Sequence, residues 1–349
     1  MRKFLSKVFS KTTLIVILLL LQIAVLVFLF LFLESYPIIS TILTIIGALV
    51  AFYIVNSKSP SDYKIAWLFF LVFAPVFGAL CYIFFANKKF SKKQMKKYAP
   101  TVEALNEADK IFNRELPILD EKKDADAINI STYIYNYAHI PLYRNTKATY
   151  FSWGQDGFPI MLERLKSAKH YIFMEYFIIS EGKMWSEIEK ILIEKAKEGV
   201  DVRIIFDDLG SLGTFPKKAL KKFSEYGIKY VAFNPIRPLI DIRMNNRDHR
   251  KILVIDGHTG FTGGINIADE YINEIVRFGV WKDNVLMLEG EGVFGLTILF
   301  LSNYKLATKE LETSDFMSYL PLIYKNETKP FEDDGFVQPY GSIPFSYET

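Results

Sequence analysis

The stretch NRDHRKILVIDG at residues 246–257, followed by GGIN at residues 263–266, gives the strongest indication of the fold. Its apolar run at 252–255 is typical of a strand that is buried on both faces. Because successive side chains of a strand point to opposite faces, His249 and Lys251 are expected to project together at the beginning of this strand. The stretch therefore predicts a buried strand with a histidine and a lysine on one face.

Similar apolar runs alternate with helical patterns on both sides of this strand. We expect further strands at 171–179, 202–206, 228–233 and 285–288, and helices at 184–197, 215–226 and 293–307. Alternation of this kind is typical of an α/β domain with a largely parallel or mixed sheet that is covered by helices on both faces.

The first ninety residues differ in composition from the rest of the chain. They contain three apolar segments, at 12–33, 38–55 and 65–86. A run of about 20 apolar residues is long enough to cross a bilayer, and the first segment is too long for a cleaved signal peptide. The sequence therefore predicts an N-terminal helical membrane region over residues 1–89, in a multi-pass protein of the cell membrane.

The basic residues that flank this region indicate conflicting orientations. Four lie within the first eleven residues, and six lysines lie between residues 88 and 97. Basic residues favour the cytoplasmic side, but three full crossings would separate the two groups. We expect the domain after the lysines to be cytoplasmic, so that either the segment with Pro75 does not cross or the N-terminus is outside. The lysines either attract anionic lipid headgroups or are a simple flank of the membrane region.

Composition excludes several classes of protein. The formal net charge of +3 is too small for a globally basic nucleic-acid binder, and the core motif has no basic-aromatic track, so we expect no nucleic-acid partner. The single cysteine, Cys81, excludes an internal disulfide framework and a cysteine-rich zinc site.

The residues of the motif suit phosphate chemistry. An imidazole can attack phosphorus or transfer a proton, and a neighbouring ammonium can hold the non-bridging oxygens. Gly263 and Gly264 allow the backbone to approach a phosphate, and Asn266 offers an amide donor. The pair His-x-Lys alone is common, whereas its combination with Asp256 and Gly-Gly-x-Asn at fixed spacing is specific.

That full pattern resembles the signature of the phospholipase D superfamily, with glycine at a position that is often serine. The resemblance implies an α/β fold with a phospholipase D-like mixed β-sheet flanked by helices, preceded here by the helical membrane region. It extends to the bacterial cardiolipin synthases over nearly the whole chain. The matching residues are Ala66-Trp67, Pro75, Gly78, Tyr82, Tyr150-Phe151, Gly154, Ala168-Lys169, EYFII at 175–179, DDLGS at 207–211, WKD at 281–283 and DGFVQPYGS at 334–342.

On this resemblance, residues 90–144 are a connector, residues 145–330 are the catalytic half, and residues 331–349 are a linker toward a second half. The family pattern has two copies of the motif, whereas these 349 residues contain one. We expect this chain to be the N-terminal portion of such an enzyme. Either the chain is a truncated or split gene product, or two copies of it pair in a homodimer.

The implied reaction is a ping-pong phosphatidyl transfer. One histidine attacks the phosphorus of phosphatidylglycerol and releases glycerol, and a hydroxyl of a second phosphatidylglycerol resolves the phosphatidyl-histidine to give cardiolipin. The resemblance implies no metal and no organic cofactor. A phospholipase D-type hydrolase and an inactive membrane fragment are the alternatives.

Each motif residue receives a role from the resemblance. His249 is the nucleophile, or the acid and base if the other histidine attacks. Lys251, Asn266, Gly263 and Gly264 are expected to bind the substrate phosphate. Asp256 belongs to the catalytic motif, but its opposite strand parity predicts that it stabilises the motif and does not touch substrate.

Four acidic residues outside the motif need partners or a function. Glu175 lies inside an apolar strand, where an unpaired carboxylate is costly, so it either supports the catalytic basic groups or forms a structural ion pair. Asp283 is expected to orient a catalytic imidazole. Asp207-Asp208 resembles a pair of metal ligands, but with no third ligand in the sequence a structural role at a strand-to-loop turn is favoured.

Overall fold

The computed structural model describes most of the chain after residue 34. The described residues are 20, 23–24, 27–28, 31–32, 35–57, 59, 61–73, 78–79, 81–83, 86, 125–138, 140–215, 217–236, 247–277, 279–308, 318–319 and 335–341. Most of the apolar segment 12–33, Pro75, the lysines at 88–97 and most of the connector lie outside them. The chain divides into an N-terminal unit that includes residues 1–89 and a second unit that includes 90–235 and 247–346.

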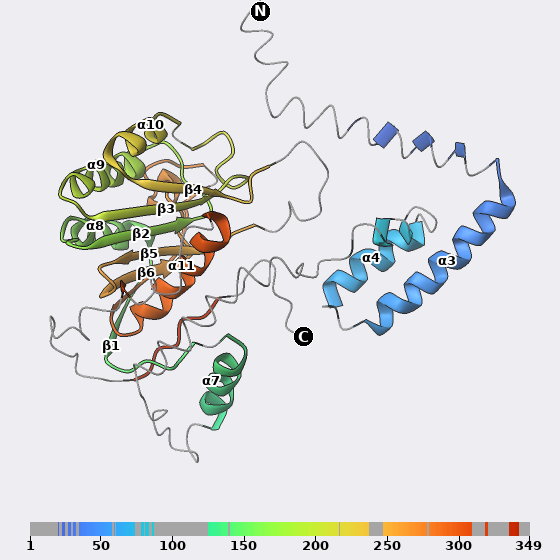
Figure 1. Cartoon of the computed structure of the whole chain (residues 1–349), viewed down its shortest axis with the longest axis horizontal. Helices are drawn as coiled ribbons and strands as arrows, with labels where there is room; N and C mark the ends of the chain where they lie inside the picture. Colours follow the sequence, from blue (N-terminus) through green and yellow to red (C-terminus); the bar gives the residue numbers. More distant parts are fainter. Residues whose placement is uncertain are drawn as a thin grey trace, which may run out of the picture. The chain divides into compact units, whose positions relative to one another are not determined.

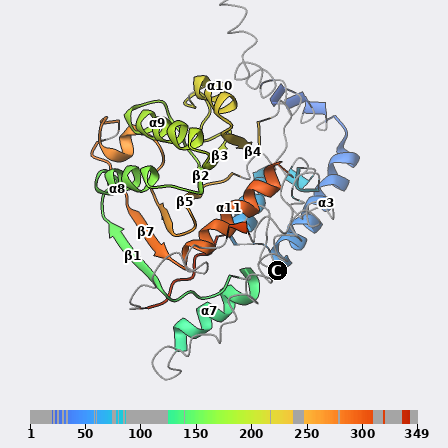
Figure 2. The ribbon, with the colours of Figure 1, turned by 60° about the vertical axis from the view of Figure 1, so that its left-hand side comes forward.

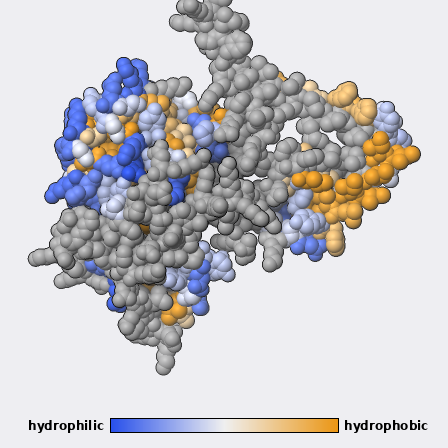
Figure 3. All heavy atoms as spheres, viewed as in Figure 1, coloured by the Kyte–Doolittle hydropathy of each residue, from blue (hydrophilic) through white to orange (hydrophobic). Residues whose placement is uncertain are grey.

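The N-terminal unit contains one helix that is long and apolar enough to cross a membrane, among the residues that the structure describes. This is α3, Pro37–Asn56, which coincides with the second predicted segment. Pro37 stands at its beginning, where the missing N–H of proline costs no helical hydrogen bond. Its surface is strongly apolar (Figure 3), as a lipid-facing helix requires.

A second helix of this unit, α4, Ser61–Phe73, overlaps the third predicted segment and packs against α3. Ile54, Leu71 and Ala79 form a small buried cluster between these elements. A Cβ at Gly78 would lie 3.0 Å from the Cα of Leu71, so the absence of a side chain there permits close packing. The number of membrane crossings stays a prediction.

The second unit is built on one seven-stranded mixed sheet with the order β1-β7-β6-β5-β2-β3-β4 (Figure 1). The strands are β1 Thr146–Phe151, β2 Tyr171–Tyr176, β3 Asp201–Asp207, β4 Lys229–Phe233, β5 Lys251–Ile255, β6 Thr259–Gly263 and β7 Val285–Gly290. The pairs β2–β3 and β3–β4 are parallel, and the other neighbouring pairs are antiparallel. The predicted mixed sheet is confirmed.

Helices cover both faces of this sheet. On one face lie α8 Gly154–Lys166, α9 Lys183–Lys197 and α10 Lys217–Tyr226, while α11 Val293–Thr308 crosses the other (Figure 2). The α11 helix is buried from Val293 to Lys305, which explains why most of its residues are apolar. The remaining described elements are α7 Ala125–Ala138 and a short 3-10 helix, η2 Asp269–Ile272.

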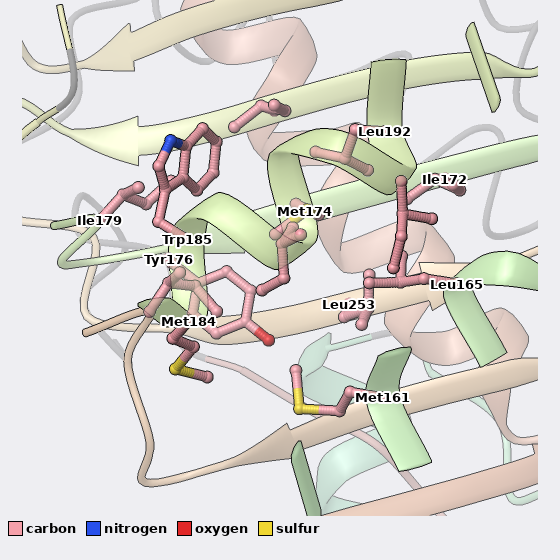
Figure 4. Close-up of a cluster of buried hydrophobic side chains, with 14 of the residues drawn as sticks. Met161, Leu165, Ile172, Met174, Tyr176, Ile179, Met184, Trp185, Leu192 and Leu253 are labelled. Atoms are coloured by element: carbon pink, nitrogen blue, oxygen red, sulfur yellow. The ribbon is translucent and has the colours of Figure 1, made fainter. Parts of the chain in front are cut away.

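Two apolar cores lie on the two faces of the sheet, and β5 contributes to both. Leu253 and Ile255 face the core under α8 and α9, and Ile252 and Val254 face α11. In the first core, side chains such as Met161 of α8, Met174 of β2 and Trp185 of α9 pack together (Figure 4). The predicted run at 252–255 is therefore a strand that is buried on both faces.

The prediction for β2 was too long, because the strand ends at Tyr176 and not at residue 179. After this point the backbone leaves the ladder and bonds to side chains. The N–H of Ile178 donates to Oδ1 of Asn266 at 3.0 Å, and the N–H of Ile179 donates to Oγ of Ser211 at 3.1 Å.

Asp256 ends β5 in a left-handed conformation with φ 52. Its carboxylate accepts the backbone N–H groups of Lys169, His170 and Tyr171 at 2.8, 2.7 and 2.9 Å. These donors form the turn between α8 and β2, at the end of the sheet opposite to His249. Asp256 thus joins the end of β5 to the beginning of β2, and its expected absence from the substrate contacts stays a prediction.

Replacing this carboxylate should reduce stability without acting on the site directly. Asp256→Ala leaves three N–H groups without their acceptor, and we expect a loss of roughly 2–4 kcal/mol in the free energy of unfolding. Thermal unfolding of the full chain in detergent measures it. An unchanged melting temperature would show that these hydrogen bonds contribute nothing to the fold.

Candidate functional site

The candidate site lies at the end of the sheet where β2 finishes and β5 begins. Antiparallel pairing places Tyr176 opposite Lys251, and Gly263 opposite Val285. The end of β2, the beginning of β5, the end of β6 and the beginning of β7 are therefore neighbours. Residues 175–179, 247–251, 263–266 and 281–284, which are far apart in sequence, meet at this end.

His249 and Lys251 converge on the ring of Phe177. The imidazole ring lies 4.9 Å from the Phe177 ring in an edge arrangement, and Nζ of Lys251 lies 5.6 Å from the centre of the same ring. Nζ of Lys251 also donates to the carbonyl oxygen of His249 at 2.6 Å. The imidazole is exposed while the lysine is buried, so the histidine faces solvent with the ammonium beside it.

Burial and neighbouring charges set the charge states of both groups. Desolvation lowers the pKa of Lys251 to about 8, although Asp248 and Asp283 favour its charged form. Desolvation and the charge of Lys251 lower the pKa of His249, against Asp248 and Asp207, which raise it. Near neutral pH the site therefore presents a neutral imidazole beside an ammonium.

The two glycines of the motif bring β7 close to this site. At Gly263, with φ +144, a Cβ would lie 2.5 Å from the carbonyl oxygen of Asn284. At Gly264 a Cβ would collide with the carboxylate of Asp283. Atoms of Asn284 and Asp283 thus occupy the space beside both glycines. The expected contact of the glycines with a phosphate stays a prediction.

Asp283 acts on the lysine of the motif. Its Oδ1 accepts the N–H of Asn284 at 2.9 Å, and its charge opposes deprotonation of Lys251. A role in orienting the imidazole stays a prediction.

Asn266 is buried, and its amide is bound within the protein. Its Oδ1 accepts the N–H of Ile178, and its Nδ2 donates to the hydroxyl of Tyr271 at 2.8 Å. These bonds join the end of β2 to the segment after β6. The amide therefore supports the backbone beside Phe177, and the phosphate-binding role expected from the sequence stays a prediction.

Glu175 forms an ion pair, one of the two alternatives for this residue. Its Oε1 lies 2.7 Å from Nε of Arg250, which is also 3.0 Å from Oδ1 of Asp248. Nδ2 of Asn303 donates to Asp248 at 2.9 Å and to Glu175 at 3.2 Å. Burial raises the pKa of Glu175 well above its usual range, and the Arg250 charge opposes this shift. The cluster lies on the α11 face, opposite to the face of Lys251.

Asp207 is a contributor whose link to the motif the sequence did not reveal. It is fully buried at the end of β3, and its Oδ2 accepts the N–H of Asp248 at 3.0 Å. Phe177 was also missed as a site residue, although the segment that contains it was part of the family resemblance. The sequence does show that Phe177 is an aromatic residue directly after a buried strand. Its contacts with His249 and Lys251, however, depend on β2 and β5 being neighbours in the sheet.

Among the residues described, no group of three or more histidine, cysteine, aspartate or glutamate side chains is placed to hold a metal ion. Oδ1 of Asp207 accepts the N–H groups of Leu209 and Gly210, each at 2.9 Å. The structural role at a strand-to-loop turn, favoured over metal binding for Asp207-Asp208, is thus seen for Asp207.

Two protein-family models match parts of the chain. "Cardiolipin synthase, PLD-like domain" matches residues 161–280, and "Phospholipase_D-nuclease N-terminal" matches residues 42–87. The first match includes the sheet from β2 to β6 and all the motif residues up to Asn266. The second includes most of α3 and all of α4.

Similarity to individual relatives covers more of the chain than these two family matches do. An uncharacterized protein of Streptococcus mutans serotype c is 39% identical over 85% of this chain and 62% of its own length. Cardiolipin synthase 2 of Bacillus anthracis is 35% identical over 73% of this chain and 49% of its own length. Cardiolipin synthase of Halalkalibacterium halodurans is 32% identical over 89% of this chain and 60% of its own length. This chain therefore spans between about half and three fifths of these relatives.

The chain also matches solved structures at low sequence identity. The phospholipase D family member Nuc from Salmonella typhimurium is 19% identical, with a TM-score of 0.36, over 47% of this chain and 97% of that chain.

The contact between Gly264 and Asp283 can be tested by adding one methyl group. Gly264→Ala forces the Asp283 carboxylate to move, and overpacking of this kind costs about 1–3 kcal/mol. We expect a lower melting temperature for the full chain. Gly335→Ala is the matched control, because a Cβ at Gly335 meets nothing within 4 Å. Equal melting temperatures for the two variants would contradict the close contact between Gly264 and the Asp283 carboxylate.

Proposed function

Since the chain carries the PLD-like domain of the cardiolipin synthase family, we propose that it supplies one half of a phosphatidyl-transfer site. The proposed reaction converts two molecules of phosphatidylglycerol to cardiolipin and glycerol. The observation that supports it most directly is the convergence of the His249 ring and the Lys251 ammonium on Phe177 at one end of the sheet.

In the first step, a ring nitrogen of His249 attacks the phosphorus of phosphatidylglycerol. A P–N bond forms, the P–O bond to glycerol breaks, and the histidine of a second motif donates a proton to the leaving oxygen. In the second step that histidine removes a proton from a hydroxyl of another phosphatidylglycerol. The hydroxyl oxygen attacks phosphorus and the P–N bond breaks, which restores both histidines. If the other histidine attacks, His249 is the acid and base.

The two basic groups of the motif fit this division of work. A nucleophilic imidazole must be neutral, and desolvation together with the charge of Lys251 lowers the pKa of His249. The Lys251 ammonium is fixed by its hydrogen bond to the carbonyl oxygen of His249. From there it would hold the non-bridging oxygens of the phosphate as negative charge develops. Together with the histidine of the second motif, these two side chains would supply the groups that the proposed steps use, and no cofactor is proposed.

The second motif is proposed to come from a partner. The relatives of known name are longer than this chain, which spans 49% to 60% of them. Either a second copy of the chain or a further motif-bearing segment would complete the site. Phospholipids are the proposed substrates, and no nucleic-acid partner is proposed.

We place the catalytic unit at the cytoplasmic side of the cell membrane. The α3 helix is long enough to cross a bilayer, and the six lysines between residues 88 and 97 favour the cytoplasmic side for the domain that follows them. A multi-pass arrangement is part of this proposal.

A lipid assay tests the proposed reaction. The 349 residues are expressed in cells that lack their own cardiolipin synthase, and cardiolipin and glycerol are measured in their membranes. We expect cardiolipin from the chain alone if it pairs with itself, or after co-expression of a chain with a second motif, and loss in His249→Ala. Release of phosphatidic acid in place of cardiolipin would favour the hydrolase. If neither the chain alone nor its co-expression with a second motif gives a product, the proposed catalytic function is wrong.

The pH profile of the transfer tests the roles of the two basic groups. Activity should rise as His249 loses its proton, at a pH below the usual histidine range, because its pKa is lowered. Activity should fall through about pH 8, where Lys251 loses its charge. The rate measured from pH 5 to 10 should give a bell-shaped curve. A rate that stays constant up to pH 10 would remove the Lys251 ammonium from the mechanism.

A further inference from the structure

We propose that Asp207 is a positioning residue for His249, acting through the two residues that precede the histidine. Oδ2 of Asp207 accepts the N–H of Asp248 at 3.0 Å, and Oδ1 lies 3.3 Å from Nη1 of Arg247. The same guanidinium donates through Nη2 to the carbonyl oxygen of Asn234 at 2.9 Å. One carboxylate therefore binds the motif by a backbone bond and a side-chain ion pair.

Asp207 itself is held firmly by its own loop. Its Oδ1 accepts the N–H groups of Leu209 and Gly210, and its side chain has no exposed surface. Such a carboxylate has little freedom to move, so the backbone that it binds is fixed relative to β3. Because Asp248 is the direct neighbour of His249, this contact restricts the direction in which the imidazole projects.

The loop after β3 also supports the other side of the site. Oγ of Ser211 donates to the carbonyl oxygen of Phe177 at 3.1 Å. A Cβ at Gly210 would collide with that same carbonyl, so glycine is needed where the loop passes Phe177. Residues 207–211 thus contact both the segment that carries the histidine and the aromatic ring against which it lies.

Asp207 also contributes charge to the site. The charged groups that act on His249 are Lys251, which lowers the pKa of the imidazole, and Asp248 and Asp207, which raise it. Arg247 pairs with Asp207 and offsets part of its negative charge. A change at Asp207 should therefore alter the protonation of His249 as well as its position.

The charge effect can be measured without any enzymatic activity. Diethylpyrocarbonate modifies neutral imidazole, His249 is exposed, and mass spectrometry separates its peptide from those of the three other histidines. The full chain in lipid nanodiscs is treated across a pH series. In Asp207→Asn we expect the midpoint for His249 to fall by roughly half a unit, a fraction of the shift from a charge in direct contact. In Arg247→Gln, which leaves Asp207 without its cation, we expect the midpoint to rise.

Asp208→Asn is the matched control, since it removes a charge from the adjacent position and should leave the midpoint unchanged. Unchanged midpoints in both test variants would overturn the proposal, and so would an equal shift in the control. Arg247→Gln keeps the hydrogen bonds from Leu209 and Gly210 to Asp207. If Asp207→Asn fails to fold, the midpoint measured in Arg247→Gln tests the proposal by itself. A lower His249 midpoint in Asp207→Asn together with a higher one in Arg247→Gln supports the proposal, even if no phosphatidyl transfer is found.

The kinetic part rests on the proposed function. If His249 attacks phosphorus, Asp207→Asn should lower kcat about tenfold with little change in KM, because a misplaced nucleophile slows the chemical step but not substrate binding. A rise in KM at constant kcat would assign Asp207 to substrate binding and overturn the positioning role.

Discussion

The antiparallel position of β5 between β2 and β6 is the constraint on which the site depends. This strand is buried on both faces and hydrogen-bonds on both sides, so a slip of its register by one residue would exchange the side chains of the two cores and turn Lys251 to the α11 face. The beginning of β5 is therefore fixed against the end of β2, and the residues just before it are carried to the same place. A flexible loop could not hold a histidine and a lysine together with comparable accuracy.

Buried carboxylates connect this strand to the rest of the unit. Asp256 accepts three N–H groups beyond its far end, Asp207 binds the segment before its near end, and Glu175 pairs with Arg250 beside it. An isolated buried charge is costly, so each of these groups constrains the geometry of the donors around it. Removing one partner leaves the other uncompensated, which is why polar contacts in this part of the core specify one arrangement of the chain.

The sequence predicted the parts of this arrangement that follow from local periodicity. The run at 252–255 and the parity of His249 and Lys251 need no knowledge of tertiary structure. By contrast, β6 was not predicted, because TGFTG at 259–263 lacks an apolar alternation and forms a strand only between β5 and β7. Its Gly260 also lies against α11, where a Cβ would be 2.9 Å from Cδ1 of Leu296. The contacts of Phe177 and Asp207 with the motif depend on strand order, which spacing along the chain does not encode.

The alternation of side chains along residues 247–251 places the proposed catalytic side chains on one face of the segment and the side chains that form structural contacts on the other. Asp248 and Arg250 point toward α11, where they bond to Asn303 and Glu175. His249 and Lys251 point toward Phe177 on the other face. A spacing of two between the histidine and the lysine is therefore required in an extended chain, since a spacing of one or three would place one of them in the ion-pair cluster. The intervening residue is equally constrained, because a side chain at 250 without a positive charge would leave Glu175 and Asp248 together without their cation.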